Sequence, residues 1–119
     1  MNAVEVALAG MLGSPGLVGV ALLDGTTGLL HASAGQTGAI GPGADLADLA
    51  ALVTDRLGTA GAEGELESFV VTTTHWHHVM QAVPQRGGGL LLCAVLDRAS
   101  TNLALALRDM AEHARLVLA

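Results

Sequence analysis

The sequence has 119 residues, no lysine, and only two aromatic side chains, Phe69 and Trp76. Without lysine the chain cannot contain a P-loop, whose motif ends in Gly-Lys-Ser/Thr, or form a lysine Schiff base. Its basic residues are five arginines, and eleven acidic residues bring the formal net charge to −6. This balance disfavours nucleic-acid binding, which needs a clustered positive surface and usually stacking aromatic side chains.

Cysteine is equally scarce, since Cys93 is the only one and no internal disulfide can form. It lies in the apolar run 90–96, where we expect a buried, unreactive thiol. The sequence contains no Gly-x-Ser-x-Gly, Cys-x-x-Cys or His-Glu-x-x-His motif. The acidic residues that could do acid–base chemistry have no neighbours that suggest a cleft, and we expect them to be solvated: Asp24, Asp97, Glu63, Glu65 and Glu67. We therefore predict neither an enzyme nor a cofactor site.

Long hydrophobic runs are absent, although hydrophobic residues make up 51% of the chain. The longest run, 90–96, is far shorter than the roughly 20 residues of a spanning helix, so no membrane insertion is predicted. No lysine or arginine precedes the first apolar residues, which is atypical of a secretory signal and favours the cytoplasm. We expect a single domain over residues 1–119, with its apolar excess covered by a second copy or another partner.

Hydrophobic periodicity predicts three helices and five strands. The expected helices cover residues 2–12, the segment from Pro42 to a stop at Gly58, and residues 100–118. The expected strands cover residues 17–23, 29–33, 66–73, 77–83 and 90–96. The links between consecutive strands are short enough for hairpins, including a turn over residues 84–89. The fold class is therefore an α/β (α+β) sandwich, a mainly antiparallel five-stranded sheet with helices on its faces and strand 90–96 at its centre.

The second helix carries the most informative pattern. Its apolar residues fall at i, i+3, i+4, i+7 and i+11 and form one stripe: Leu46, Leu49, Ala50, Val53 and Leu57. Leu52 lies off the stripe and widens it. This face either covers the helix's own sheet or binds a partner, and the small size of the domain favours a partner.

The last helix has a simpler amphipathic pattern. The residues expected to face inward are Leu103, Leu107, Met110, Ala114 and Val117. On the opposite side, Arg108 and Glu112 are spaced for an i, i+4 ion pair.

A cluster of histidines, His75, His77 and His78, surrounds Trp76. Histidines at i and i+2 of a strand share a face and could hold a metal, but a structural zinc site needs about four ligands. The other candidates, His31, His113 and Cys93, have no spacing that points to the cluster. We therefore predict no metal site and expect a hairpin that exposes its imidazoles and half-buries Trp76. A pH-sensing role is a second interpretation of these histidines.

The order of elements and three stretches of sequence resemble the Roadblock/LC7 family. The stretches are residues 27–33 (TGLLHAS), 78–83 (HVMQAV) and 96–106 (LDRASTNLALA). The resemblance implies a profilin-like α-β-β-α-β-β-β-α fold. It also implies a homodimer in which the second helices and third strands meet and join two five-stranded sheets into one of ten. The residues assigned to this dimer or partner interface are Leu46, Leu49, Leu52, Val53, Arg56, Phe69 and Val71.

The same resemblance implies a non-catalytic regulator or scaffold that binds a small Ras-like GTPase. In filamentous actinobacteria, proteins that resemble this family occur in gene sets with a histidine-kinase-like membrane protein. Such a protein is an additional expected partner and would bring the chain to the membrane periphery. Arg56 and Arg86 are the candidates for contacting an acidic partner. The sequence departs from the family at the turn containing His75, which lacks the Gly or Asn of a tight hairpin. The alternatives are a small-molecule sensor of profilin- or PAS-like architecture and a metal-dependent hydrolase built on the histidines.

Overall fold

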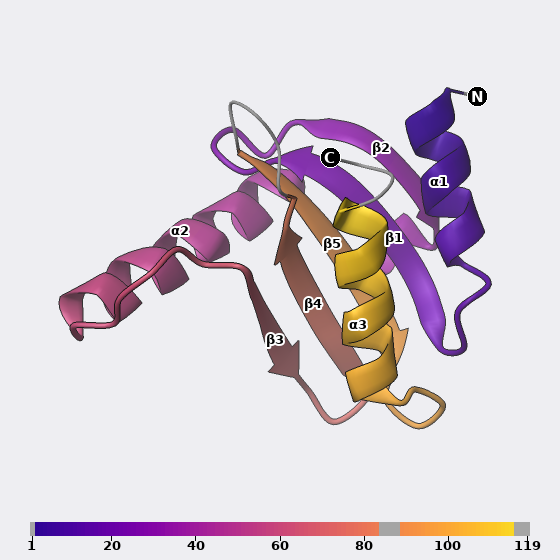
Figure 1. The fold of residues 1–119 in the computed structure, drawn as a ribbon. Coiled ribbons are helices and arrows are strands. Elements are labelled where there is room, and N and C mark those ends of the chain that lie inside the picture. The colour runs from indigo at the N-terminus through magenta and orange to yellow at the C-terminus, as the bar shows by residue number, and fades with distance from the viewer. Residues whose placement is uncertain (1, 84–88, 116–119) are drawn as a thin grey trace.

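A computed structural model describes residues 2–83 and 89–115 (Figure 1). The predicted order of helices and strands is confirmed, with one additional 3₁₀ helix, η1. In chain order the elements are α1 (Ala3–Met11), β1 (Leu17–Asp24), β2 (Leu30–Gly35), η1 (Thr37–Ala39), α2 (Gly43–Thr59), β3 (Ser68–Thr72), β4 (Trp76–Ala82), β5 (Leu90–Asp97) and α3 (Leu103–His113).

The five strands form one sheet in the order β2-β1-β5-β4-β3, and every neighbouring pair is antiparallel. The most hydrophobic strand, β5, lies at the centre and is buried from Leu91 to Leu96, as its continuous apolar run predicts. The two edges are β2 and β3.

The two faces of the sheet are covered by different helices (Figure 1). On one face α1 and α3 pack side chains such as Leu8 and Met110 against Leu92. The other face carries the row Phe69–Met80–Cys93–Ala21 across four strands, and α2 packs against part of it. Side chains of successive strand residues point to opposite faces, so both faces of β5 need a covering layer.

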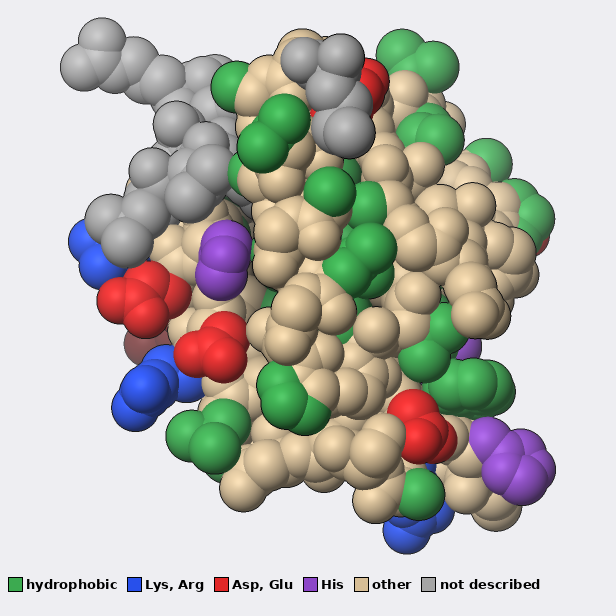
Figure 2. Space-filling view, turned by 90° about the vertical axis from the view of Figure 1, so that its right-hand side faces the viewer, with side chains coloured by type: hydrophobic (Ala, Val, Ile, Leu, Met, Phe, Trp, Pro, Cys, Tyr) green, Lys and Arg blue, Asp and Glu red, His purple; other side chains and the backbone are tan. Residues whose placement is uncertain are grey.

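Figure 2 views the molecule from the side that carries α1 and the β2 edge. Charged side chains lie mainly toward the margins of this side, and hydrophobic side chains are scattered between them without forming a single broad patch. Within the described part of the chain, no helix combines the length and the apolar character needed to cross a membrane.

Two predicted helix boundaries are wrong for reasons of capping. Gly58 does not end α2, because a glycine inside a helix costs only about 1 kcal/mol. The helix runs to Thr59, and the left-handed residue that typically ends a helix is Gly61, with φ +87°. The last helix begins at Leu103 rather than residue 100, because the Asn102 side chain accepts the N–H of Leu105 at 3.2 Å and caps the helix there.

The predicted inward face of α3 is confirmed where it is described. Met110 and Ala114 are buried, and Leu103 and Leu107 are half-buried. Val117, the predicted helix end at residue 118, and the predicted turn at 84–88 lie outside the described residues.

The predicted ion pair between Arg108 and Glu112 is wrong. Glu112 Oε1 lies 4.0 Å from Arg115 Nη2 instead. The i, i+3 neighbour is as accessible as the i, i+4 neighbour on an exposed helix surface. A solvated pair of this kind contributes little to stability.

Candidate interaction surface on α2 and β3

The start of α2 is seated on the turn between β1 and β2. Gly28, with φ +79°, lies directly against the backbone of Gly43 and Ala44, and a Cβ at this position would overlap the Ala44 nitrogen. Only glycine combines this backbone conformation with so close an approach. The contact fixes where α2 leaves the sheet.

The same turn is held by a carboxylate. Asp24 Oδ1 accepts the backbone N–H groups of Thr26 and Thr27, both at 2.8 Å. The bond from Thr27, followed by that from Thr26, lowers the pKa of Asp24 below its ordinary value of 3.8. Asp24 is therefore a structural residue of this turn.

α2 covers only part of its face of the sheet. Leu46, Leu49 and Ala50, in its first half, pack onto the sheet core. From residue 51 onward, every residue of α2 except Val53 is exposed. The second half of the helix extends past the edge of the sheet (Figure 1). The first half of the stripe therefore covers the helix's own sheet, and partner binding by the second half stays a prediction.

The exposed half of α2 still carries large apolar side chains. Leu52 is 50% exposed and Leu57 is 47% exposed. Leu57 does not cover the helix's own sheet, because at this point the helix has passed beyond the strands. Large apolar side chains that gather on an exposed surface typically mark an interaction site.

The neighbouring edge strand, β3, continues this surface. It pairs with β4 alone. Phe69 is half-buried opposite Met80, and Val71 is 42% exposed opposite His78. An edge strand presents unpaired backbone N–H and C=O groups, which are a template for another strand.

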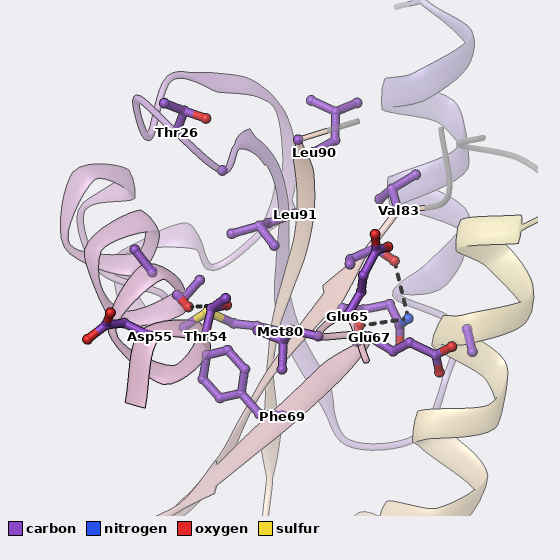
Figure 3. A pocket seen from close by; sticks show the side chains of 18 of the residues that line it. Thr26, Thr54, Asp55, Glu65, Glu67, Phe69, Met80, Val83, Leu90 and Leu91 are labelled. Carbon is purple, nitrogen blue, oxygen red and sulfur yellow. Dashed lines mark hydrogen bonds between the residues drawn. The ribbon is translucent and has the colours of Figure 1, made fainter. Parts of the chain in front are cut away.

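A groove of about 1100 Å³ runs between α2 and this end of the sheet. Figure 3 shows Phe69 and Met80 reaching from the sheet toward Thr54 of α2, with Asp55 on the outer side of the helix. The wall opposite α2 includes Glu65 and Glu67. The groove is thus apolar at its base, and its charged lining residues are three carboxylates and Arg115.

The seven predicted interface residues all lie on α2 and β3. Arg56, Leu52 and Val71 are exposed, and the other four are half-buried: Leu46, Leu49, Val53 and Phe69. Their contact with a partner stays a prediction. Arg86 lies outside the described residues.

Sequence reasoning missed three β4 residues on the same face, Trp76, His78 and Met80. Their spacing at every second position places them on one face of β4. The pairing of β3 with β4 puts that face beside Phe69 and Val71, because residues opposite one another share a face.

The histidines do not form one site. β4 begins at Trp76, so His75 lies in the preceding turn and not on the strand with His77. His77 is buried with Nδ1 2.8 Å from Thr72 Oγ1, so the expectation that it is exposed is wrong. His78 points to the opposite face by strand alternation. Among residues 2–83 and 89–115, no three His, Cys, Asp or Glu side chains gather closely enough to hold a metal ion. Trp76 is half-buried, as predicted.

The β3–β4 turn forms without Gly or Asn because a threonine side chain caps it. Thr73 Oγ1 accepts the backbone N–H groups of His75 and Trp76 at 3.3 and 3.0 Å. Ser and Thr hydroxyls stabilise turns in this way. This explains the departure from the tight-hairpin pattern.

Cys93 lies in the middle of β5 and is buried. Burial raises the pKa of its thiol to about 12. The predicted burial of this thiol is confirmed. Because reactive cysteines need exposure and a lowered pKa, its low reactivity stays a prediction.

Three helices and a five-stranded antiparallel sheet in the order α-β-β-α-β-β-β-α form a Roadblock/LC7-like fold. Myxococcus xanthus MglB superposes with a TM-score of 0.76 over 93% of this chain and 84% of that chain, at 17% identity. A Roadblock/LC7 domain from Streptomyces avermitilis gives 0.74 over 92% and 90%, at 18% identity. The gliding protein MglB from Thermus thermophilus gives 0.72 over 98% and 88%, at 20% identity.

No protein-family model and no curated protein sequence matches this chain. The likeness is therefore one of fold, and it extends over nearly the whole chain. It confirms the fold that the resemblance in sequence implied.

Proposed function

We propose that this chain is a homodimeric, non-catalytic regulator or scaffold that binds a small Ras-like GTPase. The observation that carries the proposal is the half-covered sheet face formed by α2 and β3, on a fold like that of the MglB structures. The central strands β1 and β5 are apolar on both faces, and the partial cover on one face favours a second molecule there.

A second copy of the chain is the partner that best fits this face. Leu52, Leu57 and Val71 offer exposed apolar area next to the half-buried Phe69, and β3 offers an unpaired edge. Two such edges can pair in an isologous contact and continue the sheet from one copy into the other. The proposed interface is the set of seven residues predicted from the sequence, extended by Leu57.

The GTPase partner is inferred from the Roadblock/LC7 resemblance. A regulator of this kind needs no chemistry of its own, because it acts by binding one nucleotide state of its partner more tightly than the other. Arg56 is exposed on α2 beside Leu52 and supplies a cation for acidic residues of the GTPase. A cytoplasmic location, with a histidine-kinase-like membrane protein as a further partner, belongs to the same proposal.

The test is a pull-down from the native cell's lysate with GTP or GDP added, followed by titration of the recovered protein in purified form. We expect a small GTPase that binds at least about tenfold more tightly in one nucleotide state, equivalent to about 1.4 kcal/mol. Equal affinity for both nucleotide states would indicate a scaffold rather than a regulator. Recovery of no GTPase with either nucleotide would overturn the proposal.

A small-molecule sensor is the second candidate, and the groove beside α2 is the observation that favours it. Its volume is large enough for a ligand. Phe69 is the only aromatic residue among those that line it, and three carboxylates lie along it: Asp55, Glu65 and Glu67. A metabolite panel in a thermal-shift assay tests this alternative, and binding that Phe69→Ala abolishes would support it.

A further inference from the structure

The groove beside α2 lies on the side of the helix away from the proposed dimer interface. The α2 residues that line the groove are Ala50, Ala51, Thr54 and Asp55. Since each helical residue is turned by about 100° from the one before it, the interface residues of α2 are centred on the nearly opposite flank: Leu46, Leu49, Leu52, Val53, Arg56 and Leu57. Of the whole proposed interface, only Phe69 also lines the groove. The groove is therefore a second surface of α2.

The base of the groove is apolar and comes from three strands of the sheet. Phe69 of β3, Met80 of β4 and Leu91 of β5 all line it (Figure 3). Met80 and Leu91 are buried, and Phe69 is half-buried. Ala50 and Ala51 are small, so the helix leaves room above these side chains. A hollow with such a base favours an apolar side chain of a ligand, because burial there removes apolar surface from water.

Hydrogen bonds within the chain hold the walls of the groove. Glu67 O accepts the backbone N–H of Ala82 at 2.7 Å and Gln81 Nε2 at 3.2 Å, which fixes the segment before β3 against β4. On the opposite wall, Thr54 Oγ1 donates to Ala50 O at 3.0 Å. Because these groups are already bonded in the free protein, a ligand that enters the groove orders fewer groups on binding.

Carboxylates outnumber cations in the lining of the groove. Asp55 belongs to α2, whereas Glu65 and Glu67 belong to the opposite wall, and all three are exposed. Arg115 is the one basic residue among the described residues of the lining, and Glu112 Oε1 lies 4.0 Å from its Nη2. Negative charge is therefore in excess on both sides of the apolar base. Such an arrangement attracts a ligand of positive charge and orients it.

We propose that this groove binds a short segment of another protein, in which lysine or arginine residues stand on both sides of an apolar residue. The apolar side chain packs on Phe69 and Met80. One cation lies against Asp55, and another lies against Glu65 and Glu67. The inference goes beyond the proposed function, because it gives the scaffold a binding surface for a basic partner while the interface on the other flank of α2 is occupied.

Other occupants match this chemistry less well. A second copy of the chain carries a formal charge of −6 and no lysine. Within residues 2–83 and 89–115, every arginine has an acidic residue within three positions in the sequence, so this part of the chain has no purely basic segment: Arg56, Arg98, Arg108 and Arg115. A small molecule needs polar groups that converge on it, whereas these carboxylates stand on opposite walls and suit an elongated ligand.

The ligand chemistry is tested by selecting displayed random peptides on the full chain. Counter-selection uses Ala51→Trp, because Ala51 is exposed and the larger side chain fills the groove. We expect the enriched peptides to carry lysine or arginine on both sides of an apolar residue. Ala104→Trp, on the exposed side of α3, is the matched control and should bind them like the wild type. Enrichment of neutral or acidic peptides, or of none that Ala51→Trp excludes, would overturn the proposal.

The carboxylates are tested with the best enriched peptide, synthesised and measured by fluorescence anisotropy. The triple variant Asp55→Asn/Glu65→Gln/Glu67→Gln keeps the side-chain shapes and removes the charges. From the usual strength of exposed ion pairs, we expect the peptide Kd to rise about tenfold. A control variant loses the same charge at exposed acidic residues outside the groove and should change Kd little: Asp45→Asn/Asp48→Asn/Glu63→Gln. Equal Kd values for the two triple variants would mean non-specific attraction and would overturn the contact.

Further outcomes separate this inference from the proposed function. Leu52→Asp, on the other flank of α2, should weaken the dimer and leave the peptide Kd unchanged. A change of the dimer Kd in Ala51→Trp would place a second copy in the groove. A metabolite that raises the Tm of the wild type and not of Ala51→Trp would place a small molecule there, and either result would overturn the peptide site. Absence of a GTPase in the pull-down, with peptide binding intact, would overturn only the proposed function.

Discussion

The two faces of the same sheet are closed to different degrees. Where α1 and α3 pack on the sheet, Leu8 of α1 and Leu92 of β5 have no exposed surface. Beneath α2, the core is closed only near the start of the helix, and Leu52, Leu57 and Val71 remain near half-exposed at its margin. Both faces belong to the same five strands, so the difference comes from the helices that cover them. One face is completed within the chain, and we propose that a partner completes the other.

The helices on the two faces also differ in how their N-termini are capped. α1 and α3 each begin with an asparagine side chain that accepts a backbone N–H of the first turn, Asn2 from Glu5 and Asn102 from Leu105. α2 begins at Gly43, and its N-cap residue Pro42 provides no side-chain hydrogen bond. Its position is fixed instead by the contact of Gly43 and Ala44 with Gly28. The closed face is thus stabilised locally, whereas α2 depends on what it packs against.

The largest expected effect is in the closed face. Leu92→Ala should lower the free energy of unfolding by about 2–5 kcal/mol, because it leaves a cavity between the sheet and the helices α1 and α3. Urea denaturation at a fixed protein concentration measures the loss. Leu105→Ala, on the exposed side of α3, is the matched truncation and should change stability by no more than about 0.5 kcal/mol. Equal losses at both positions would contradict the closed core described here.

The next largest effect is on dimerisation, and it distinguishes the exposed surface of α2 from the exposed surface of α3. Leu52 and Leu105 are exposed to nearly the same extent, at 50% and 52%. Leu52→Asp should raise the dimer Kd by about a hundredfold, because a carboxylate loses solvent in each copy. Leu105→Asp should leave it unchanged. Analytical ultracentrifugation reads both, and a fully dimeric Leu52→Asp chain would argue against the α2 interface.

A smaller effect is expected from the cap of α3. Asn102→Ala should reduce the free energy of unfolding by about 1 kcal/mol, because the N–H of Leu105 loses its side-chain acceptor. Asn102→Asp, which keeps an acceptor oxygen, should retain most of the stability. Dimerisation should be the same in all three chains, and a change in Kd would mean that the closed face also takes part in association.

The smallest effect concerns the turn that seats α2. The hydrogen bonds from Thr27 and Thr26 lower the pKa of Asp24, so its carboxylate stabilises the folded state. That contribution is complete above the ordinary pKa of 3.8 and is lost as the pH falls through the lower folded-state pKa. The stability difference between wild type and Asp24→Ala should therefore be constant from pH 5 to 7 and shrink below about pH 3.8. A difference that grows in acid would contradict this sign.

Much of the fold was predictable because it depends on local patterns. The apolar run of β5 predicted its central position, and the amphipathic spacing of Leu103, Leu107 and Met110 predicted the inner face of α3. The boundaries were less predictable, since Asn102 and Gly61 outweighed the residues that periodicity favoured. The placement of His77 was also missed, because its burial depends on a hydrogen bond to Thr72 on the neighbouring strand.

The candidate surface was predictable in composition and not in extent. All seven predicted residues lie on α2 and β3, whereas Trp76, His78 and Met80 joined them only through the pairing of β4. The exposure of Leu57 depends on where α2 passes the edge of the sheet. The sequence pattern of the helix does not indicate where α2 passes that edge.

The sequence by itself determined which residues avoid water, the order of helices and strands, and the absence of a P-loop and of an internal disulfide. The tertiary structure decided what covers those residues: two helices on one face, and half of one helix on the other. The physical reason is that an apolar stripe specifies burial without specifying the layer that provides it. The contact of Gly28 with the start of α2 directs the helix past the edge of the sheet. The edge strand β3, which pairs with β4 alone, lies beside it.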